Sequence, residues 1–273
     1  MNEERQAEHR GDWRRTMAIP VLVALVAMLV AAVLVDRQNQ QIAESNLRSD
    51  ALNQISVIRA KLEGHIAGNI QLIKGLVAVI STEPDMDQAR YDALVSNIFE
   101  EGSQLRSVAA APDLIITMTH PLAGNEAAIG LNYRHVPAQW PAVREVLETG
   151  SLNIAGPVEL VQGGQGFVGR FPVFTGPEDN RQFWGLVSAV VDVQKLYADS
   201  GLLDPELGLD ISITGHDGTG RTGKRFFGPD LSEADPVTAS VVLPSGSWEI
   251  AAAPRQGWGA DPVSTWSLRG LIL

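Results

Sequence analysis

Nineteen consecutive residues, Met17 to Val35, carry no charge. An α-helix needs about 20 apolar residues to cross the hydrocarbon core of a bilayer, so this stretch predicts a transmembrane helix. A cleaved secretory signal is the alternative, but its apolar part would be about 7 to 15 residues long and would end in a small-x-small cleavage site. The run here is longer and reaches Asp36 without such a site. We therefore expect an uncleaved anchor over residues 17–35.

Basic residues near the apolar run indicate its orientation. Four arginines precede it and only two follow it closely: Arg5, Arg10, Arg14 and Arg15 before, Arg37 and Arg48 after. The positive-inside rule then places the tail 1–16 in the cytoplasm and the bulk of the chain in the periplasm, with the anchor in the cytoplasmic (inner) membrane. A second apolar run begins at residues 267–273, which we interpret as the start of a second transmembrane helix. As given, the chain is expected to cross the membrane once.

Composition limits the chemistry that this chain can perform. The net charge of −11 argues against nucleic acid as a partner, and the absence of cysteine excludes disulfides and thiolate metal sites. The five histidines lie far apart and no hydrolase motif occurs, so we expect no metal, no cofactor and no enzyme in this region. Gly218 to Lys224 has the spacing of a phosphate-binding loop, but Arg225 stands where Ser or Thr should bind magnesium. A glycine-rich turn is expected there.

Residues 36–80 predict one long helix with an apolar stripe. Leu62, Ile66, Ile73 and Leu76 recur in steps of three or four, or a multiple of them, and Asn69 fills the missing position. A stripe of this kind must be buried. It either pairs with a second copy, forming a homodimer through a stalk in which Asn69 would fix the register, or packs along its own domain. The sequence leaves both alternatives open.

The remaining chain predicts two α+β units, each an antiparallel sheet with flanking helices, over 81–192 and 193–266. Helices are expected where apolar residues recur with helical spacing, and strands where short apolar or alternating runs lie between turn residues. In the larger unit we expect helices 85–102 and 137–149 and strands 105–110, 114–119, 159–162, 166–174 and 183–191. In the smaller unit we expect a helix 194–200 and strands 209–214, 225–227, 237–243 and 248–253.

Several segments of the larger unit, taken in order, resemble the CHASE sensory domain. They are Gly130-Leu131-Asn132, Thr149-Gly150, Leu160 to Gly166, and Phe171-Pro172-Val173. The resemblance extends from about residue 51 to 258. It implies two PAS-like units after a long helix, the larger one membrane-distal with a small-molecule pocket against its sheet, the smaller one membrane-proximal. The family commonly has an aspartate where this chain has Asn132, whose amide can still donate and accept hydrogen bonds.

Pocket candidates are the residues expected to face the helices of the larger unit. Several of these residues have a structural alternative. The phenylalanines could belong to the core, the glycine could form a β-bulge, and the tyrosine could anchor its loop. The arginine could bind the carboxylate of a ligand or be a solvated charge at the edge of the sheet. The candidates are Arg106, Thr117, Asn132, Tyr133, Phe167, Gly169 and Phe171.

These features together predict the extracytoplasmic input region of a membrane-bound signalling protein of the histidine kinase or nucleotide cyclase type. An unidentified small molecule would be its ligand, and a cytoplasmic kinase or cyclase output domain would follow in the same natural chain. The alternative is a membrane-anchored structural or assembly protein without a small-molecule ligand.

Overall fold

The computed structural model describes residues 2–99, 103–160 and 163–259, and side chains from Pro20 onward. The chain divides into two compact units, one formed by the segments 1–50 and 256–273 and the other by Ala51–Arg255. The predicted second transmembrane helix at 267–273 lies outside the described residues.

Helix α1 (Asn2–Thr82) contains the apolar run found in the sequence. Within the described residues it is the one helix long and apolar enough to cross a membrane, and the side chains of its most apolar part are not buried. Val21, Leu29 and Leu34, for example, are exposed. This pattern is consistent with a membrane anchor over the predicted residues 17–35.

In the second unit, the apolar stripe of α1 is buried in the chain's own fold. Ile55, Leu62, Ile73 and Ile80 have no exposed surface, and the buried Asn69 donates its side-chain amide to Gln104 Oε1 at 3.0 Å. Of the two alternatives that the sequence left open, the single chain therefore shows intramolecular packing. Asn69 connects the helix to Gln104, directly before the first strand.

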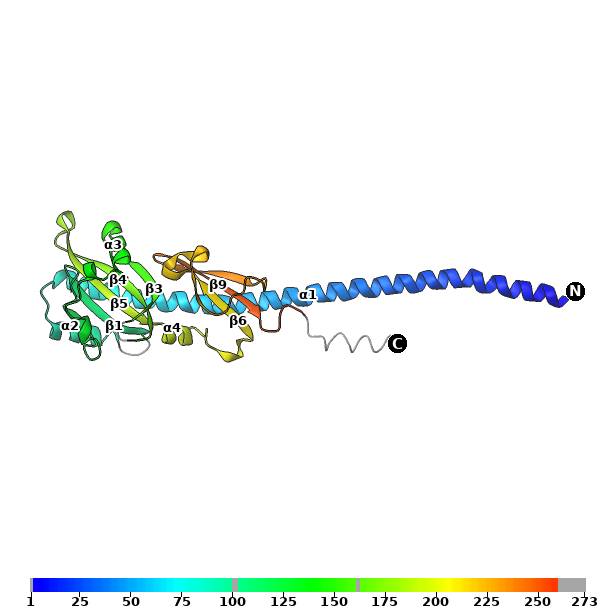
Figure 1. Ribbon diagram of the computed structural model, residues 1–273, viewed down its shortest axis with the longest axis horizontal. Coiled ribbons are helices and arrows are strands. Elements are labelled where there is room, and N and C mark those ends of the chain that lie inside the picture. The colour runs from blue at the N-terminus through cyan, green and yellow to red at the C-terminus, as the bar shows by residue number, and fades with distance from the viewer. Residues whose placement is uncertain (1, 100–102, 161–162, 260–273) are drawn as a thin grey trace. The chain divides into compact units, whose positions relative to one another are not determined.

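Two antiparallel sheets follow α1, as expected for the α+β class (Figure 1). Across the described residues the larger sheet has five strands in the order β2-β1-β5-β4-β3, and the smaller has four in the order β7-β6-β9-β8. The strands are β1 (Leu105–Pro112), β2 (Met118–His120), β3 (Asn153–Glu159), β4 (Gln165–Thr175), β5 (Gln182–Asp192), β6 (Leu209–Thr214), β7 (Arg225–Phe227), β8 (Val237–Leu243) and β9 (Gly246–Pro254).

Short helices accompany the sheets. These are α2 (Gln88–Ser96), α3 (Trp140–Thr149) and α4 (Val193–Asp199), with 3-10 turns at η1 (Glu126–Ala128), η2 (Tyr133–His135), η3 (Glu178–Asn180), η4 (Pro205–Leu207), η5 (His216–Gly218) and η6 (Gly220–Thr222). Gly150 ends α3 in the left-handed conformation, as its position predicts. The loop that imitates a phosphate-binding motif forms the two turns η5 and η6.

Several boundaries differ from the sequence-based prediction. The strand predicted at 114–119 is reduced to β2 (Met118–His120), because Asp113 and Leu114 adopt positive φ angles and form a turn. The helix predicted at 137–149 begins at Trp140, and the helix predicted at 85–102 ends at Ser96.

Helix α2 is capped by Asp87, whose side chain accepts a hydrogen bond from the Arg90 N–H, so it begins later than the predicted residue 85. Strand β3 lies earlier than the predicted range 159–162, because it includes the Gly156-Pro157 pair. Proline is tolerated in β3 since this strand forms an edge of its sheet.

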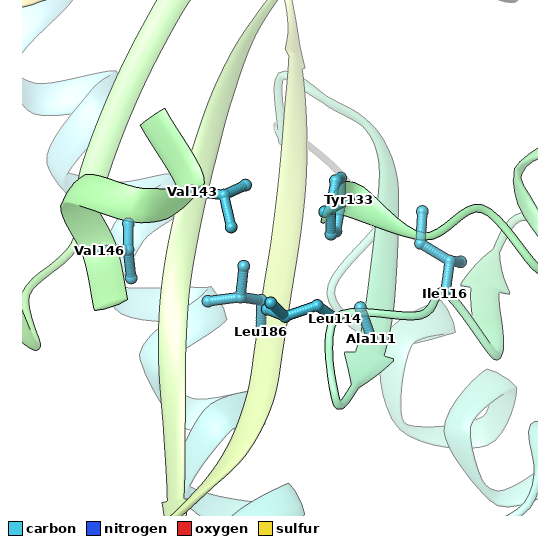
Figure 2. Close-up of a cluster of buried hydrophobic side chains, with 7 residues drawn as sticks. All are labelled: Ala111, Leu114, Ile116, Tyr133, Val143, Val146 and Leu186. Atoms are coloured by element: carbon cyan, nitrogen blue, oxygen red, sulfur yellow. The ribbon is translucent and has the colours of Figure 1, made fainter. Parts of the chain in front are cut away.

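A cluster of seven buried hydrophobic side chains lies between α3 and one face of the five-stranded sheet. Figure 2 shows its seven side chains directed toward one another, with Val143 and Val146 from α3 facing Leu186 of β5. Tyr133 belongs to the same cluster and is 3% exposed. This packing fixes the segment before α3 against the sheet, where the candidate site lies.

Candidate ligand-binding site

A cavity of about 100 Å³ lies on the α3 side of the larger sheet. Its walls come from β1, β3, β4, β5 and the segment between β2 and α3. The lining residues are Ser107, Ala109, Ile116, Thr119, Asn125, Ala127, Ala128, Leu131, Tyr133, Gln139, Val158, Glu159, Leu160, Val168, Ser188 and Val190. Aliphatic side chains make up about half of this lining, and hydroxyl, amide and carboxylate groups make up most of the rest. A cavity of this composition suits a small organic molecule.

Backbone pairing carries Tyr133 over the sheet. The Ile116 N–H donates to the Leu131 carbonyl at 3.0 Å, and the Tyr133 N–H donates to the Leu114 carbonyl at 3.0 Å. The Asn132 side chain accepts from the Arg134 N–H at 3.0 Å and so caps the short turn η2. These bonds fix the loop that closes one side of the cavity.

The buried hydroxyl of Tyr133 donates to Ser188 Oγ of β5 at 2.8 Å. Burial raises the pKa of Tyr133, and the hydrogen bond to Ser188 offsets part of that rise. The phenol therefore stays protonated at neutral pH and is a neutral hydrogen-bonding group on the cavity wall.

Gln139 forms another polar point of the wall, at the start of α3. Its Oε1 accepts a hydrogen bond from Nη2 of Arg170 at 3.2 Å. Arg170 is on β4 and only 1% exposed. Burial lowers the pKa of its guanidinium, while the nearby Tyr133 and Asp217 act in the opposite direction. An arginine remains charged even so, which places a positive charge behind the Gln139 side of the cavity.

Of the seven residues predicted from the sequence, Tyr133 is the one that lines this cavity. Asn132 is adjacent but uses its side chain as a cap, and Thr117 is exposed, between β1 and β2. A role of these two residues in ligand binding stays a prediction.

Three of the other four predicted residues, all on β4, lie on the opposite face of the larger sheet. Arg106 lies at the register shift between Leu105 and Ser107 of β1, so the alternation of side chains along a strand does not fix its direction, and its Nη1 lies next to Gly164. A role of Arg106 in ligand binding stays a prediction. In β4 the same alternation turns Val168 toward the cavity and places Phe167, Gly169 and Phe171 on the other side.

Phe167 has a structural environment of its own. Its ring contacts those of Trp248, Phe226 and Tyr197, with centroid distances of 4.7, 5.9 and 6.3 Å. This aromatic cluster is the core alternative that the sequence allowed. A role of Phe167 in ligand binding stays a prediction.

Residues that the sequence reasoning missed include Ser107, Gln139, Ser188 and Arg170. Arg170 is a charged residue inside an apolar strand, as Arg106 is, and this pattern could have indicated a site residue. The pocket residues predicted on β4 are Phe167, Gly169 and Phe171, which lie on the face opposite to Arg170.

Comparisons with known proteins agree with this architecture. The CHASE domain family matches residues 65–227. An extracellular ligand-binding receptor from Desulfohalobium retbaense DSM5692 is similar with a TM-score of 0.58 and 14% identity, over 73% of this chain and 39% of that chain. The chain thus spans about two fifths of that receptor.

Two ligand-binding domains of amino acid chemoreceptors from Pseudomonas aeruginosa PAO1 are also similar. That of PctB, in complex with L-Arg, has a TM-score of 0.57 and 15% identity, over 78% of this chain and 97% of that chain. That of PctC, in complex with GABA, has a TM-score of 0.52 and 16% identity, over 72% and 95%. At these identities the likeness is one of fold. No curated protein matches the chain.

The family match covers more than half of the chain, and the two sheets after a long helix are the architecture of related sensor domains. The chain therefore belongs to the CHASE domain family.

Proposed function

We propose that this chain is the extracytoplasmic input region of a membrane-bound signalling protein, of the histidine kinase or nucleotide cyclase type, and that its ligand binds in the cavity of the larger unit. The anchor at 17–35 would hold it in the cytoplasmic membrane with the bulk of the chain in the periplasm. No catalytic domain is evident in the described residues. An output domain in the same natural protein would read the signal.

One observation carries the choice of site. Buried polar groups, including the Tyr133–Ser188 hydroxyl pair, converge on an otherwise aliphatic cavity. A purely structural core would be filled with apolar side chains, because each buried polar group costs free energy unless it is hydrogen-bonded. Convergent polar groups in a small apolar cavity are typical of ligand sites.

Strand β3 supplies a physical route from this cavity to the smaller sheet. Val158 and Glu159 line the cavity, and the earlier residues of the strand bind the loops of the smaller sheet. The Gly156 N–H donates to Asp217 Oδ1 at 2.7 Å, and the Ile154 N–H donates to Ser245 Oγ at 2.9 Å. A ligand that shifts β3 would therefore shift these loops, which is the differential contact that signalling requires.

Homodimerisation is also a proposal. The buried stripe of α1 is used within the chain, so a dimer formed along this helix would use its exposed apolar residues, such as Leu52 and Leu72. Light scattering of the chain in detergent would measure the oligomeric state directly.

The proposed site is tested by a thermal-shift screen of the 273-residue chain in nanodiscs against a metabolite library. The variant Ala109→Ile places a larger side chain in the cavity, and Ala251→Ile makes the same change at a half-buried position of the smaller sheet. We expect hits that stabilise the wild type and Ala251→Ile but not Ala109→Ile. Hits that stabilise all three equally would refute the assignment.

A further inference from the structure

Arg170 is the most unusual buried group in the described part of the chain. Its side chain is almost fully buried on β4, and the hydrogen bond that the structure gives it goes to the neutral amide of Gln139. Nε and Nη1 have no hydrogen-bond partner among the described residues. A buried charge normally has a partner of opposite charge, because desolvation is costly. Within the described ranges, no carboxylate lies at hydrogen-bonding distance from Arg170.

The side chains around Arg170 do not fill this need. Its cross-strand neighbours are Asn153 of β3 and Ser188 of β5. Asn153 donates to Glu145 Oε2 at 2.9 Å, so this carboxylate is already used, and Asn153 Oδ1 is itself buried without a partner among the described residues. The acid that acts on Arg170 through space is Asp217.

Asp217 is also engaged elsewhere. Its Oδ1 accepts from the Gly156 N–H, and its Oδ2 lies 2.8 Å from Nδ1 of His216. Two groups without full partners among the described residues thus lie on neighbouring strands: the guanidinium of Arg170, whose Nε and Nη1 lack acceptors, and Asn153 Oδ1, which lacks a donor. A group that accepts from the guanidinium would relieve the first of these.

Arg170 does not line the cavity itself, but the residues next to it do, and Gln139 lies between its guanidinium and the cavity. Val168 lines that cavity, and Arg170 lies two residues further along the same strand, on the same face. Two neighbours of Arg170 also line the cavity. They are Gln139, whose Oε1 accepts the hydrogen bond from Nη2, and Ser188, the partner of Arg170 on β5. A molecule bound there would reach the arginine by displacing or passing the Gln139 amide.

We propose that Arg170 binds the carboxylate group of a small ligand, with the Tyr133–Ser188 pair and Gln139 as neutral hydrogen-bonding partners. This inference rests on the proposed function of the cavity. Arginine offers two parallel N–H groups that match a carboxylate, and in a desolvated site such a pair is short and strong. Each edge of the guanidinium that can form such a fork combines one of the unpartnered nitrogens, Nε or Nη1, with Nη2, so a bound carboxylate would share or take over the Nη2 contact with Gln139.

The cavity limits the size of this ligand. An apolar cavity of 150 Å³ holds benzene, so about 100 Å³ suits a molecule of roughly four to six non-hydrogen atoms. Short carboxylates of about three carbons fit, and so does a small amino acid. Glu159 on the cavity wall distinguishes a simple carboxylate from an amino acid. Its carboxylate could pair with the ammonium group of an amino acid, whereas a simple carboxylate has no such group.

The experiment titrates the full chain in nanodiscs with propionate, alanine and the neutral isostere propionamide, using calorimetry and thermal shift. Propionate or alanine is expected to bind, and propionamide to bind at least about tenfold more weakly, because it lacks the charge. Arg170→Gln should lose at least about tenfold in carboxylate affinity. The control is Arg144→Gln, which removes an exposed arginine paired with Glu148, and it should bind like the wild type.

Two further variants sharpen the result. Glu159→Gln should weaken alanine but not propionate, which identifies the source of the carboxylate. Arg170→Lys keeps the charge but not the fork, so if Arg170→Gln fails to fold, an intermediate affinity of Arg170→Lys still supports the proposal.

The outcomes separate this inference from the proposed function. Ligands that Ala109→Ile abolishes but Arg170→Gln and Arg170→Lys leave unchanged would overturn the role of Arg170 and keep the cavity as the site. Equal binding of propionate and propionamide would overturn it too. If neither carboxylate binds while neutral library compounds do, the carboxylate class is wrong and the sensor function stands.

Discussion

Replacing Arg170 by methionine removes a buried positive charge and leaves a shorter, unbranched apolar side chain. Two nitrogen atoms of Arg170 lack partners among the described residues, and each such group costs about 1–3 kcal/mol. The substitution gives up one charge-assisted hydrogen bond to Gln139, which is worth about 1.5–3 kcal/mol. The balance favours methionine by about 2 kcal/mol. We therefore expect the ligand-free variant to be more stable than the wild type.

This balance corresponds to an increase in Tm of about 4–8 °C, since 1 kcal/mol shifts Tm by about 2–4 °C in a chain of this size. Differential scanning calorimetry of the two chains in nanodiscs measures it, and the same samples should show that carboxylate affinity is lost. Arg144→Met, at an exposed position, is the matched control and should stay within about 1 °C. A Tm lowered by several degrees in Arg170→Met would show that the arginine stabilises the fold and would refute the reasoning.

Three further predictions concern stability. Asp217→Ala removes the acceptor of the Gly156 N–H and should lower the free energy of unfolding by about 1–3 kcal/mol in urea titrations, whereas Asp217→Asn, which keeps an acceptor, should lose less. Gly228→Ala should lower Tm by at least about 5 °C, because the new Cβ would clash with the Ile211 carbonyl. In Gly64→Ala on α1 the new Cβ meets no neighbouring atom, so the free energy of unfolding should rise by about 0.5–1 kcal/mol. Similar effects of the two substitutions would contradict this. Burial raises the pKa of Asp92, but hydrogen bonds from Gln88 and His120 lower it more, so its net pKa lies below 3.8. Its contribution is therefore full above pH 3.8 and lost as the pH falls through the lower folded value; Asp92→Asn should flatten the Tm profile below about pH 4, and an unchanged profile would contradict this.

Much of the fold could be predicted because its local signals agree with its tertiary structure. Strands β6, β7 and β8 occupy the predicted residues, since short β-branched and aromatic runs there lie between glycine and proline turns. The long helix could also be predicted, from the 3.6-residue spacing of its apolar residues. The partner of its apolar stripe could not be predicted, because the same stripe is needed to pack on the chain's own domain or on a second copy.

Two of the boundary differences have clear physical causes. Strand β3 continues through Gly156-Pro157, because an edge strand accommodates a proline whose N–H side needs no ladder partner. Gln88 lies three residues after Asp85, which is the spacing of a capping box. In the fold its side chain instead binds the backbone N–H and carbonyl of Thr119, so α2 begins after Asp87.

The candidate site was predicted only in part, and the reason is the burial of both faces of the larger sheet. Alternation along β4 separates Phe167 and Phe171 from Val168 and Arg170, but both sets are buried. Periodicity therefore divides the residues into two faces without indicating which one meets the cavity. Tyr133 was accessible to sequence reasoning because it lies in the loop before α3, while Ser188 and Gln139 become part of the site only through tertiary contacts.

The most direct measurement of the central claim is a set of intermolecular nuclear Overhauser effects between a bound ligand and methyl-labelled chain in nanodiscs. Propionate, or the strongest compound from the metabolite screen, is the probe. If the ligand binds in the cavity, contacts are expected to the methyl groups of Ala109, Ile116 and Val168, which line it. Contacts confined to methyl groups of the smaller sheet, such as those of Val241, would contradict it.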